Sequence, residues 1–238
     1  MPIVKADDVD IYYEVHGQGE PLLLIGGLGS DITFLAGLTR RLAERFRVIV
    51  FDNRGSGRSG KPDIPYSIEM MAADAANLLE SLDIRQANIL GISMGGRIAL
   101  ALALNHPALV SSLILVSTAA KSRGKIQMSL PFRVLSLFSW LPVLKGKYPQ
   151  PRYAFERQRQ ASLDFDVSAR LGEIAAPAIV MHGRKDRSIP FELGREMQAG
   201  IRNSKLLAFV GGHVFFMMKE RGRFIDAVFG FLAEVSSS

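Results

Sequence analysis

Short runs of branched apolar residues alternate with stretches of helical periodicity along most of this 238-residue chain. Turn signals such as Gly26-Gly27 stop the apolar runs. Runs that we interpret as strands cover residues 10–15, 21–25, 47–51, 87–90, 112–116, 178–181 and 205–209. Helices are predicted over 32–45, 67–82, 94–105, 191–200 and 215–233. This alternation predicts an α/β fold, with a mostly parallel sheet that helices cover on both faces.

The interval between Val116 and Pro177 breaks the alternation. Its 60 residues include four prolines and an excess of basic residues. We predict a mostly helical cap over 119–172, inserted into a core domain formed by 1–118 and 173–238. The aromatic residues of the cap either seal it onto the core or line a substrate pocket; they are Phe132, Phe138, Trp140, Phe155 and Phe165.

Composition excludes several classes of protein. The chain has no cysteine, which excludes disulfide scaffolds, thiolate zinc sites and cysteine nucleophiles. The central charge-free apolar run, 134–144, has 11 residues, whereas a membrane-spanning helix needs about 20. The first eight residues carry acids where a signal peptide needs an apolar stretch. We therefore expect a soluble, cytoplasmic protein with no membrane span.

The net charge of +6 is concentrated in one segment. Residues 120–170 hold ten Lys/Arg and three acids, so the remainder of the chain is close to neutral. No nucleic-acid-binding motif accompanies this excess, and we expect no nucleic acid partner. The excess fits an ordinary solvated face, a surface that attracts an anionic substrate or an acidic carrier protein, or a membrane contact.

A G-x-S-x-G motif, formed by Gly91, Ser93 and Gly95, lies where a predicted strand ends and a helix begins. So sharp a turn forces its central residue into a strained backbone conformation and brings the two glycines together. Ser93 would then project above the sheet as a nucleophile. The backbone N–H of Met94, at the start of the helix, is a natural donor to an oxyanion.

A serine nucleophile needs a base, and the chain has four histidines. His16 precedes a glycine-rich turn, and His106 ends a helix, so both have structural interpretations. His182 ends a strand, where a packed core histidine is common. His213 follows the last strand in a loop with two glycines, which permit close approach to a neighbour. We predict His213 as the base, with His182 as the alternative.

Asp186 is the predicted acid, because it follows the penultimate strand. Loops at the carboxyl edge of a parallel sheet meet on one side, where sites collect. Ser93, Asp186 and His213 all occupy such loops. A carboxylate beside the imidazole would hold its tautomer and stabilise the imidazolium.

With these residues in this order, the chain resembles the α/β-hydrolase family over essentially its whole length. Its order of serine, aspartate and histidine matches the family's nucleophile–acid–histidine order. Residues 51–59, FDNRGSGRS, are similar to the family's D-x-R-G-x-G-x-S loop, and Gly183, Asp186 and Pro190 are similar to its acid loop. The resemblance implies a second oxyanion donor, the backbone N–H of Leu28. Many members have His-Gly where this chain has Gly26-Gly27.

The resemblance implies a serine hydrolase that cleaves a carboxylic ester of a small or medium-sized substrate, without cofactor or metal. Lactonases, C–C bond hydrolases, thioesterases and cofactor-free perhydrolases use the same triad, so they remain alternatives. A ligand-binding protein without activity is a further alternative. The sequence GISMGG at 91–96 and the short cap are similar to those of enol-lactonases and of methyl esterases of carrier-bound acyl chains. In the latter case the basic cap would bind the carrier.

A second glycine motif, G-x-G-x-x-G at 55–60, matches the dinucleotide fingerprint in letters alone. A true fingerprint opens a helix that holds the pyrophosphate, but here Pro62 and Pro65 follow and the predicted helix starts near Ser67. Four scattered histidines without cysteine also give no pattern for a catalytic metal.

Overall fold

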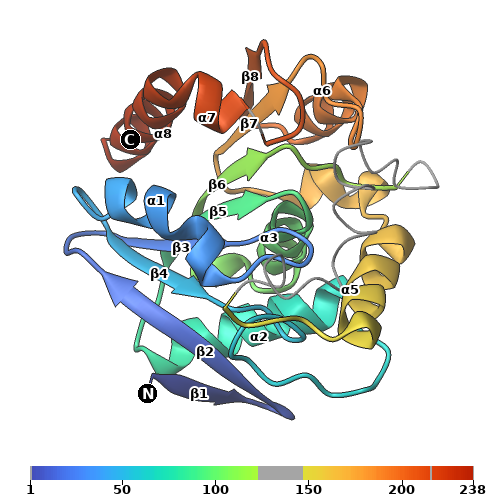
Figure 1. Cartoon of the computed structure of the whole chain (residues 1–238). Coiled ribbons are helices and arrows are strands. Elements are labelled where there is room, and N and C mark those ends of the chain that lie inside the picture. The colour runs from blue at the N-terminus through green and yellow to red at the C-terminus, as the bar shows by residue number, and fades with distance from the viewer. Residues whose placement is uncertain (1, 123–146, 215, 238) are drawn as a thin grey trace.

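A computed structural model describes residues 2–122, 147–214 and 216–237 (Figure 1). The described strands form one sheet in the order β1-β2-β4-β3-β5-β6-β7-β8. β2 pairs antiparallel with β1 and with β4, and the remaining pairs from β4 to β8 are parallel. The strands are β1 (Ile3–Ala6), β2 (Val9–His16), β3 (Pro21–Ile25), β4 (Arg47–Phe51), β5 (Ala87–Ile92), β6 (Val110–Val116), β7 (Ala178–Gly183) and β8 (Ser204–Phe209). The predicted mostly parallel α/β sheet is confirmed.

The first four predicted helices each have a counterpart in the structure. The helices are α1 (Ile32–Leu42), α2 (Ile68–Ser81), α3 (Met94–Asn105), α5 (Arg152–Asp164), α6 (Phe191–Gly200), α7 (Phe216–Lys219) and α8 (Arg221–Ser236), with 3-10 turns η1 (Pro107–Leu109) and η3 (Ser168–Glu173). The Ser67 hydroxyl accepts from the Met70 N–H and so begins α2. The predicted single helix over 215–233 is wrong. Glu220 leaves helical geometry between α7 and α8, and its carboxylate accepts from the Val210 N–H at 2.8 Å.

Two apolar clusters lie on opposite faces of the sheet. Leu22 and Leu24 of β3 point into the cluster that includes α1 and α8, while Leu23 and Ile25 point into the cluster that includes α2 and α3. Figure 1 shows these helix pairs on opposite sides of the strands. Such burial on both faces explains why the parallel strands are nearly continuous apolar runs rather than alternating ones.

The predicted cap, 119–172, is described in part. Residues 123–146, with Phe132, Phe138 and Trp140, lie outside the described residues, so the division into core and cap stays a prediction. The described part contains α5. Its buried residues, which form the inner face of the helix, are Ala154, Gln158, Ala161 and Ser162. Phe165 is also buried in the cluster shared with α2 and α3, so it seals this segment onto the core.

Several basic residues of the described cap segment lie beside acids. The pairs are Arg157–Asp63 at 3.2 Å, Arg159–Glu156 at 2.7 Å, Arg170–Glu173 at 2.8 Å and Lys121–Glu196 at 3.6 Å. This pairing favours the ordinary solvated face among the interpretations of the charge excess. Within the described ranges, no helix combines the length and the apolar character needed to cross a bilayer.

Candidate active site

Ser93 occupies the turn between β5 and α3 with a left-handed backbone, at φ 56° and ψ −115°. A Cβ atom at Gly91 would lie 2.4 Å from the Gly95 carbonyl oxygen, and one at Gly95 would lie 2.2 Å from the Ile25 carbonyl oxygen. Neither position can hold a side chain without moving backbone. The two glycines of the motif therefore allow the sharp elbow that raises Ser93 above the sheet.

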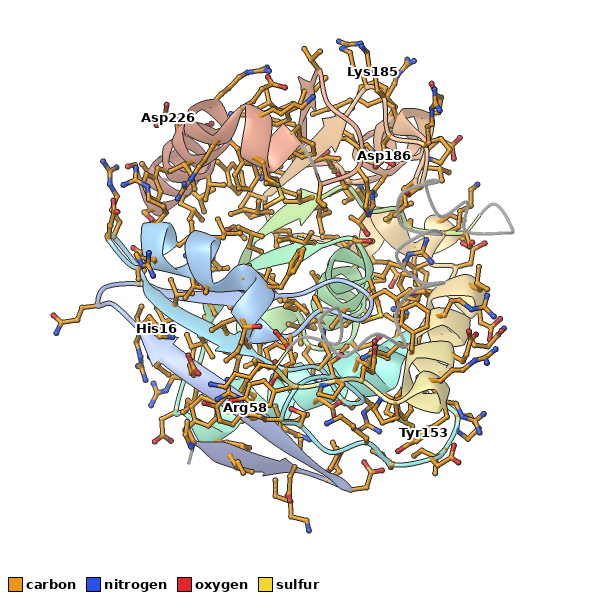
Figure 2. All side chains as sticks on the ribbon, in the orientation of Figure 1. His16, Arg58, Tyr153, Lys185, Asp186 and Asp226 are labelled. Atoms are coloured by element: carbon orange, nitrogen blue, oxygen red, sulfur yellow. The ribbon has the colours of Figure 1, made fainter. Side chains whose placement is uncertain are left out.

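The structure brings Ser93, His213 and Asp186 into one line of hydrogen bonds. His213 Nε2 lies 3.0 Å from Ser93 Oγ, and His213 Nδ1 lies 2.8 Å from Asp186 Oδ2. Ser93 follows β5, Asp186 lies in the loop from β7 to α6, and His213 follows β8 (Figure 2 labels Asp186). The parallel strands thus deliver three loops, separated in sequence, to the same edge of the sheet.

Asp186 is buried, and both of its carboxylate oxygens accept hydrogen bonds. Its Oδ1 accepts from the backbone N–H groups of Ser188 and Ile189 at 2.8 and 2.9 Å. Burial by itself raises the pKa of Asp186, but hydrogen bonds from His182 and His213 outweigh burial and hold this pKa below its usual range. The carboxylate is therefore ionised at neutral pH, as a partner for a charged imidazolium must be.

His182, the alternative base, faces the acid and not the serine. The imidazole is buried, and its Nε2 lies 2.9 Å from the Ile189 carbonyl oxygen and 3.3 Å from Asp186 Oδ2. Among the described residues, His182 makes no hydrogen bond to Ser93. Its position makes it a second support for the Asp186 loop, a role that the sequence reasoning missed. The four-residue separation of His182 and Asp186 is the signal that could have indicated it.

Ser117 is a further site residue that the sequence did not indicate. It follows β6 with a left-handed backbone, at φ 47°. Its hydroxyl donates to the His213 carbonyl oxygen at 2.7 Å. Ser117 therefore anchors the loop that carries the imidazole, although no motif of the sequence includes it.

The loop after β3 lies beside Ser93. A Cβ atom at Gly27 would lie 3.3 Å from Ser93 Cβ. The Gly27 carbonyl oxygen accepts from both the N–H and the hydroxyl of Ser30, at 3.2 and 2.8 Å. Since N–H and C=O point in opposite directions across a trans peptide, the Leu28 N–H points away from Ser30. Within the described part of the chain, neither Leu28 nor Met94 donates its N–H to another residue, so both can serve an incoming oxygen.

The family described as alpha/beta hydrolase fold matches residues 20–142, more than half of the sequence. The chain belongs to the α/β-hydrolase family.

Relatives of this α/β-hydrolase match it over nearly their whole length. RutD of Azorhizobium caulinodans, a proposed carbamate hydrolase, is 29% identical over 99% of both chains. A solved esterase from Exiguobacterium antarcticum is 26% identical, with a TM-score of 0.84 over 97% of this chain and 98% of that chain. An enol-lactonase from Burkholderia xenovorans LB400 has the same fold, at 24% identity and a TM-score of 0.82 over 98% and 100% of the two chains.

The structure gives a reason for Gly26, where many members of the family have histidine. A Cβ atom at Gly26 would lie 2.6 Å from Ser30 Oγ. The Ser30 hydroxyl therefore occupies the space that a larger side chain would need. From that place the Ser30 hydroxyl donates to the Gly27 carbonyl oxygen at 2.8 Å and stabilises the turn.

The glycine-rich segment 55–60 wraps around Asp52. The Asp52 carboxylate accepts from the backbone N–H groups of Arg58 and Ile32, both at 2.8 Å. Helix α2 begins at Ile68, so this segment opens no helix and lacks the geometry that a dinucleotide pyrophosphate requires. In the ranges that the structure describes, no group of three or more His, Asp and Glu residues is arranged to hold a metal ion.

Proposed function

We propose that this α/β-hydrolase is a serine hydrolase that cleaves a carboxylic ester of a small or medium-sized substrate through an acyl-enzyme on Ser93. The supporting observation is the unbroken hydrogen-bond line from Ser93 Oγ through His213 to Asp186, at 3.0 and 2.8 Å. Nucleophile, base and acid in this arrangement perform acyl transfer on several unrelated folds.

In the proposed first half-reaction, Ser93 Oγ attacks the acyl carbon while His213 Nε2 takes the hydroxyl proton. The N–H groups of Leu28 and Met94 bind the oxygen that becomes negative. Asp186 keeps the Nδ1 proton in place and stabilises the imidazolium. His213 then gives its proton to the alkoxide, and the alcohol leaves.

In the second half-reaction, His213 removes a proton from water as the water attacks the acyl carbon, and Ser93 regains its hydroxyl as the free acid departs. These steps need no cofactor, and the partner of the chain is the small-molecule substrate. Binding of an acidic carrier protein to the basic cap, and a cytoplasmic location, stay predictions.

Carbamate hydrolysis is a second candidate, because the RutD relative matches 99% of both chains. A carbamate presents the same trigonal carbonyl carbon to Ser93, and attack would leave a carbamoyl group on the serine. Lactones, thioesters and C–C bonds are open to the same residues. The shape of the pocket, and not the triad, selects among them.

Comparison of wild type with Ser93→Ala tests the proposal. We measure hydrolysis of nitrophenyl esters of increasing chain length, the matched carbamates, lactones and thioesters, and detect acyl groups on Ser93 by mass spectrometry. We expect Ser93→Ala to lower kcat by about 10⁴-fold or more, since the triad acts as a unit.

Ser81→Ala is the matched control, since its hydroxyl caps the exposed end of α2 through the Asn77 carbonyl. It should keep the wild-type rate. Equal turnover by wild type and Ser93→Ala would refute the proposal. Turnover of carbamates in clear preference to esters would favour the second candidate.

A further inference from the structure

One polar side chain of α5 is fully buried between two loops of the core. Gln158 Oε1 accepts from the Gly29 N–H at 3.1 Å and from Gln150 Nε2 at 3.0 Å. Gln158 Nε2 donates to the Arg54 carbonyl oxygen at 2.7 Å and lies 3.0 Å from Ser56 Oγ. These partners define the orientation of the amide, because a flipped amide would set its NH₂ against the Gly29 N–H.

The bond to Gly29 bears directly on the candidate oxyanion donor. The peptide that precedes Leu28 is held through the Gly27 carbonyl by Ser30. The peptide that follows Leu28 is held through the Gly29 N–H by Gln158. The two peptide planes on either side of Leu28 are thus both attached, and they set the direction of the Leu28 N–H.

Other contacts join α5 to the same region. Gly29 has a left-handed backbone, at φ 73°, and a Cβ atom there would lie 3.2 Å from the Phe155 ring. On α3, which begins with the other candidate donor, Met94, the buried Arg97 guanidinium donates to the Ser162 carbonyl oxygen. Ser162 lies in the last turn of α5, where helix carbonyl groups lack partners within the helix. Helix α5 therefore contacts both the loop that contains Leu28 and the helix that begins with Met94.

We propose that Gln158 is a positioning residue for the oxyanion hole. By holding the Gly29 N–H, it aims the Leu28 N–H at the carbonyl oxygen of the substrate. Helix α5 would then help to position the oxyanion donor in addition to packing against the core. This inference rests on the proposed function, because it assigns Gln158 a role in the reaction at Ser93.

The decisive variant is Gln158→Met, which keeps the length of the side chain but makes none of its hydrogen bonds. Removal of one oxyanion donor typically lowers kcat by 10²–10³-fold. Since the Leu28 N–H is misdirected here but still present, we expect kcat to fall by about 10- to 100-fold with little change in KM. Affinity for a trifluoromethyl ketone, whose hemiketal oxyanion fills the hole, should fall by the same factor.

Gln158→Glu is the conservative variant. Burial favours the neutral carboxylic acid, whose carbonyl oxygen can accept from the Gly29 N–H while its hydroxyl donates to the Arg54 carbonyl. We expect kcat and ketone affinity within about fivefold of wild type, on the same reasoning about the retained Gly29 bond.

Tyr153→Phe is the matched control on the same helix. It removes the hydrogen bond from the Tyr153 hydroxyl to the Lys61 carbonyl oxygen, at 2.7 Å, which also joins α5 to the core. Figure 2 shows Tyr153 well separated from Asp186. We expect this variant to lower thermal stability, because a hydrogen bond is lost, and to leave ketone affinity unchanged.

The outcomes are distinguishable. If wild type forms an acyl group on Ser93 while Gln158→Met keeps kcat and ketone affinity within twofold of wild type, the positioning role is refuted and the proposed function stands. If wild type forms no acyl-serine, both proposals fall. Should Gln158→Met not fold, Gln158→Asn, one methylene too short to join both loops, replaces it. Failure of both to fold would make Gln158 a structural residue and refute the proposal.

Discussion

Asp186 Oδ2 lies between two imidazoles, and each imidazole has a different second partner. His213 turns its other nitrogen to Ser93 Oγ, whereas the Nε2 of His182 lies between Asp186 and the Ile189 carbonyl. The side chain of His213 is 20% exposed, and that of His182 is fully buried. The proposed base takes protons from Ser93 and from water and gives one to the leaving alkoxide, so it needs contact with Ser93 and access to the substrate, and His213 has both.

Substitution of each histidine separates these roles. We expect His182→Leu to lower kcat by about tenfold and the free energy of unfolding by about 1–3 kcal/mol, because the Ile189 carbonyl and Asp186 lose the Nε2–H that lies between them. We expect His213→Leu to lower kcat by more than about 10³-fold. Steady-state kinetics and urea unfolding measure the two effects. A variant His182→Leu as inactive as His213→Leu would contradict this division of roles.

At the scale of elements, the β5–α3 elbow depends on backbone contacts that leave no space for side chains. The space is closed at Gly91 by the Gly95 carbonyl and at Gly95 by the Ile25 carbonyl. By contrast, the glycine at 230, within α8, has no atom within 4 Å of an added Cβ. Glycine is therefore required in the elbow, whereas in α8 it only lowers the stability of the helix.

Alanine at these two positions tests this difference. We expect Gly91→Ala to lower the free energy of unfolding by about 3 kcal/mol, because the new methyl group displaces backbone. We expect Gly230→Ala to raise it by about 0.5–1 kcal/mol, the usual gain for alanine in a helix. Urea unfolding of both variants provides the measurement. Similar midpoints for the two would contradict the steric argument.

At the scale of the whole molecule, a buried ion pair joins parts that are distant in sequence. Arg54, in the loop after β4, makes two bonds of 2.6 and 2.7 Å to the Asp74 carboxylate on α2. It also lies 3.1 Å from Asp8, between β1 and β2. Burial raises the pKa of Asp74 above its usual range, although the bonds from Arg54 oppose this rise. The pair thus connects the antiparallel edge of the sheet to the helix layer.

Removal of one partner should cost more than removal of both. We expect Arg54→Met to lower the free energy of unfolding by about 3–5 kcal/mol, because Asp74 remains buried without its cation. The double variant Arg54→Met/Asp74→Leu should recover much of this loss. Urea unfolding measures these differences. Arg170→Met, which breaks an exposed pair with Glu173, is the control and should leave the midpoint of urea unfolding unchanged. A double variant less stable than Arg54→Met would refute this account.

The sequence by itself determined the alternation of strands and helices, the elbow at Ser93 and the loops that carry Asp186 and His213. These features depend on residues close together in the chain, so periodicity and motif spacing reveal them. Strand β1 escaped prediction because its four residues are too few to show a clear alternation of apolar and polar positions.

Only the tertiary structure decided which side chains support the site. Gln158 and Gly29 are separated by 129 positions, and Ser117 and His213 by 96. The break between α7 and α8 likewise involves a hydrogen bond to Glu220 from the Val210 N–H, which lies before α7 in the loop after β8. Such contacts form between groups that the folded sheet and its connecting segments bring together, and no local pattern of residue types specifies their partners. The hydrogen bond between the loop after β3 and Gln158 of α5 is therefore a property of the assembled fold.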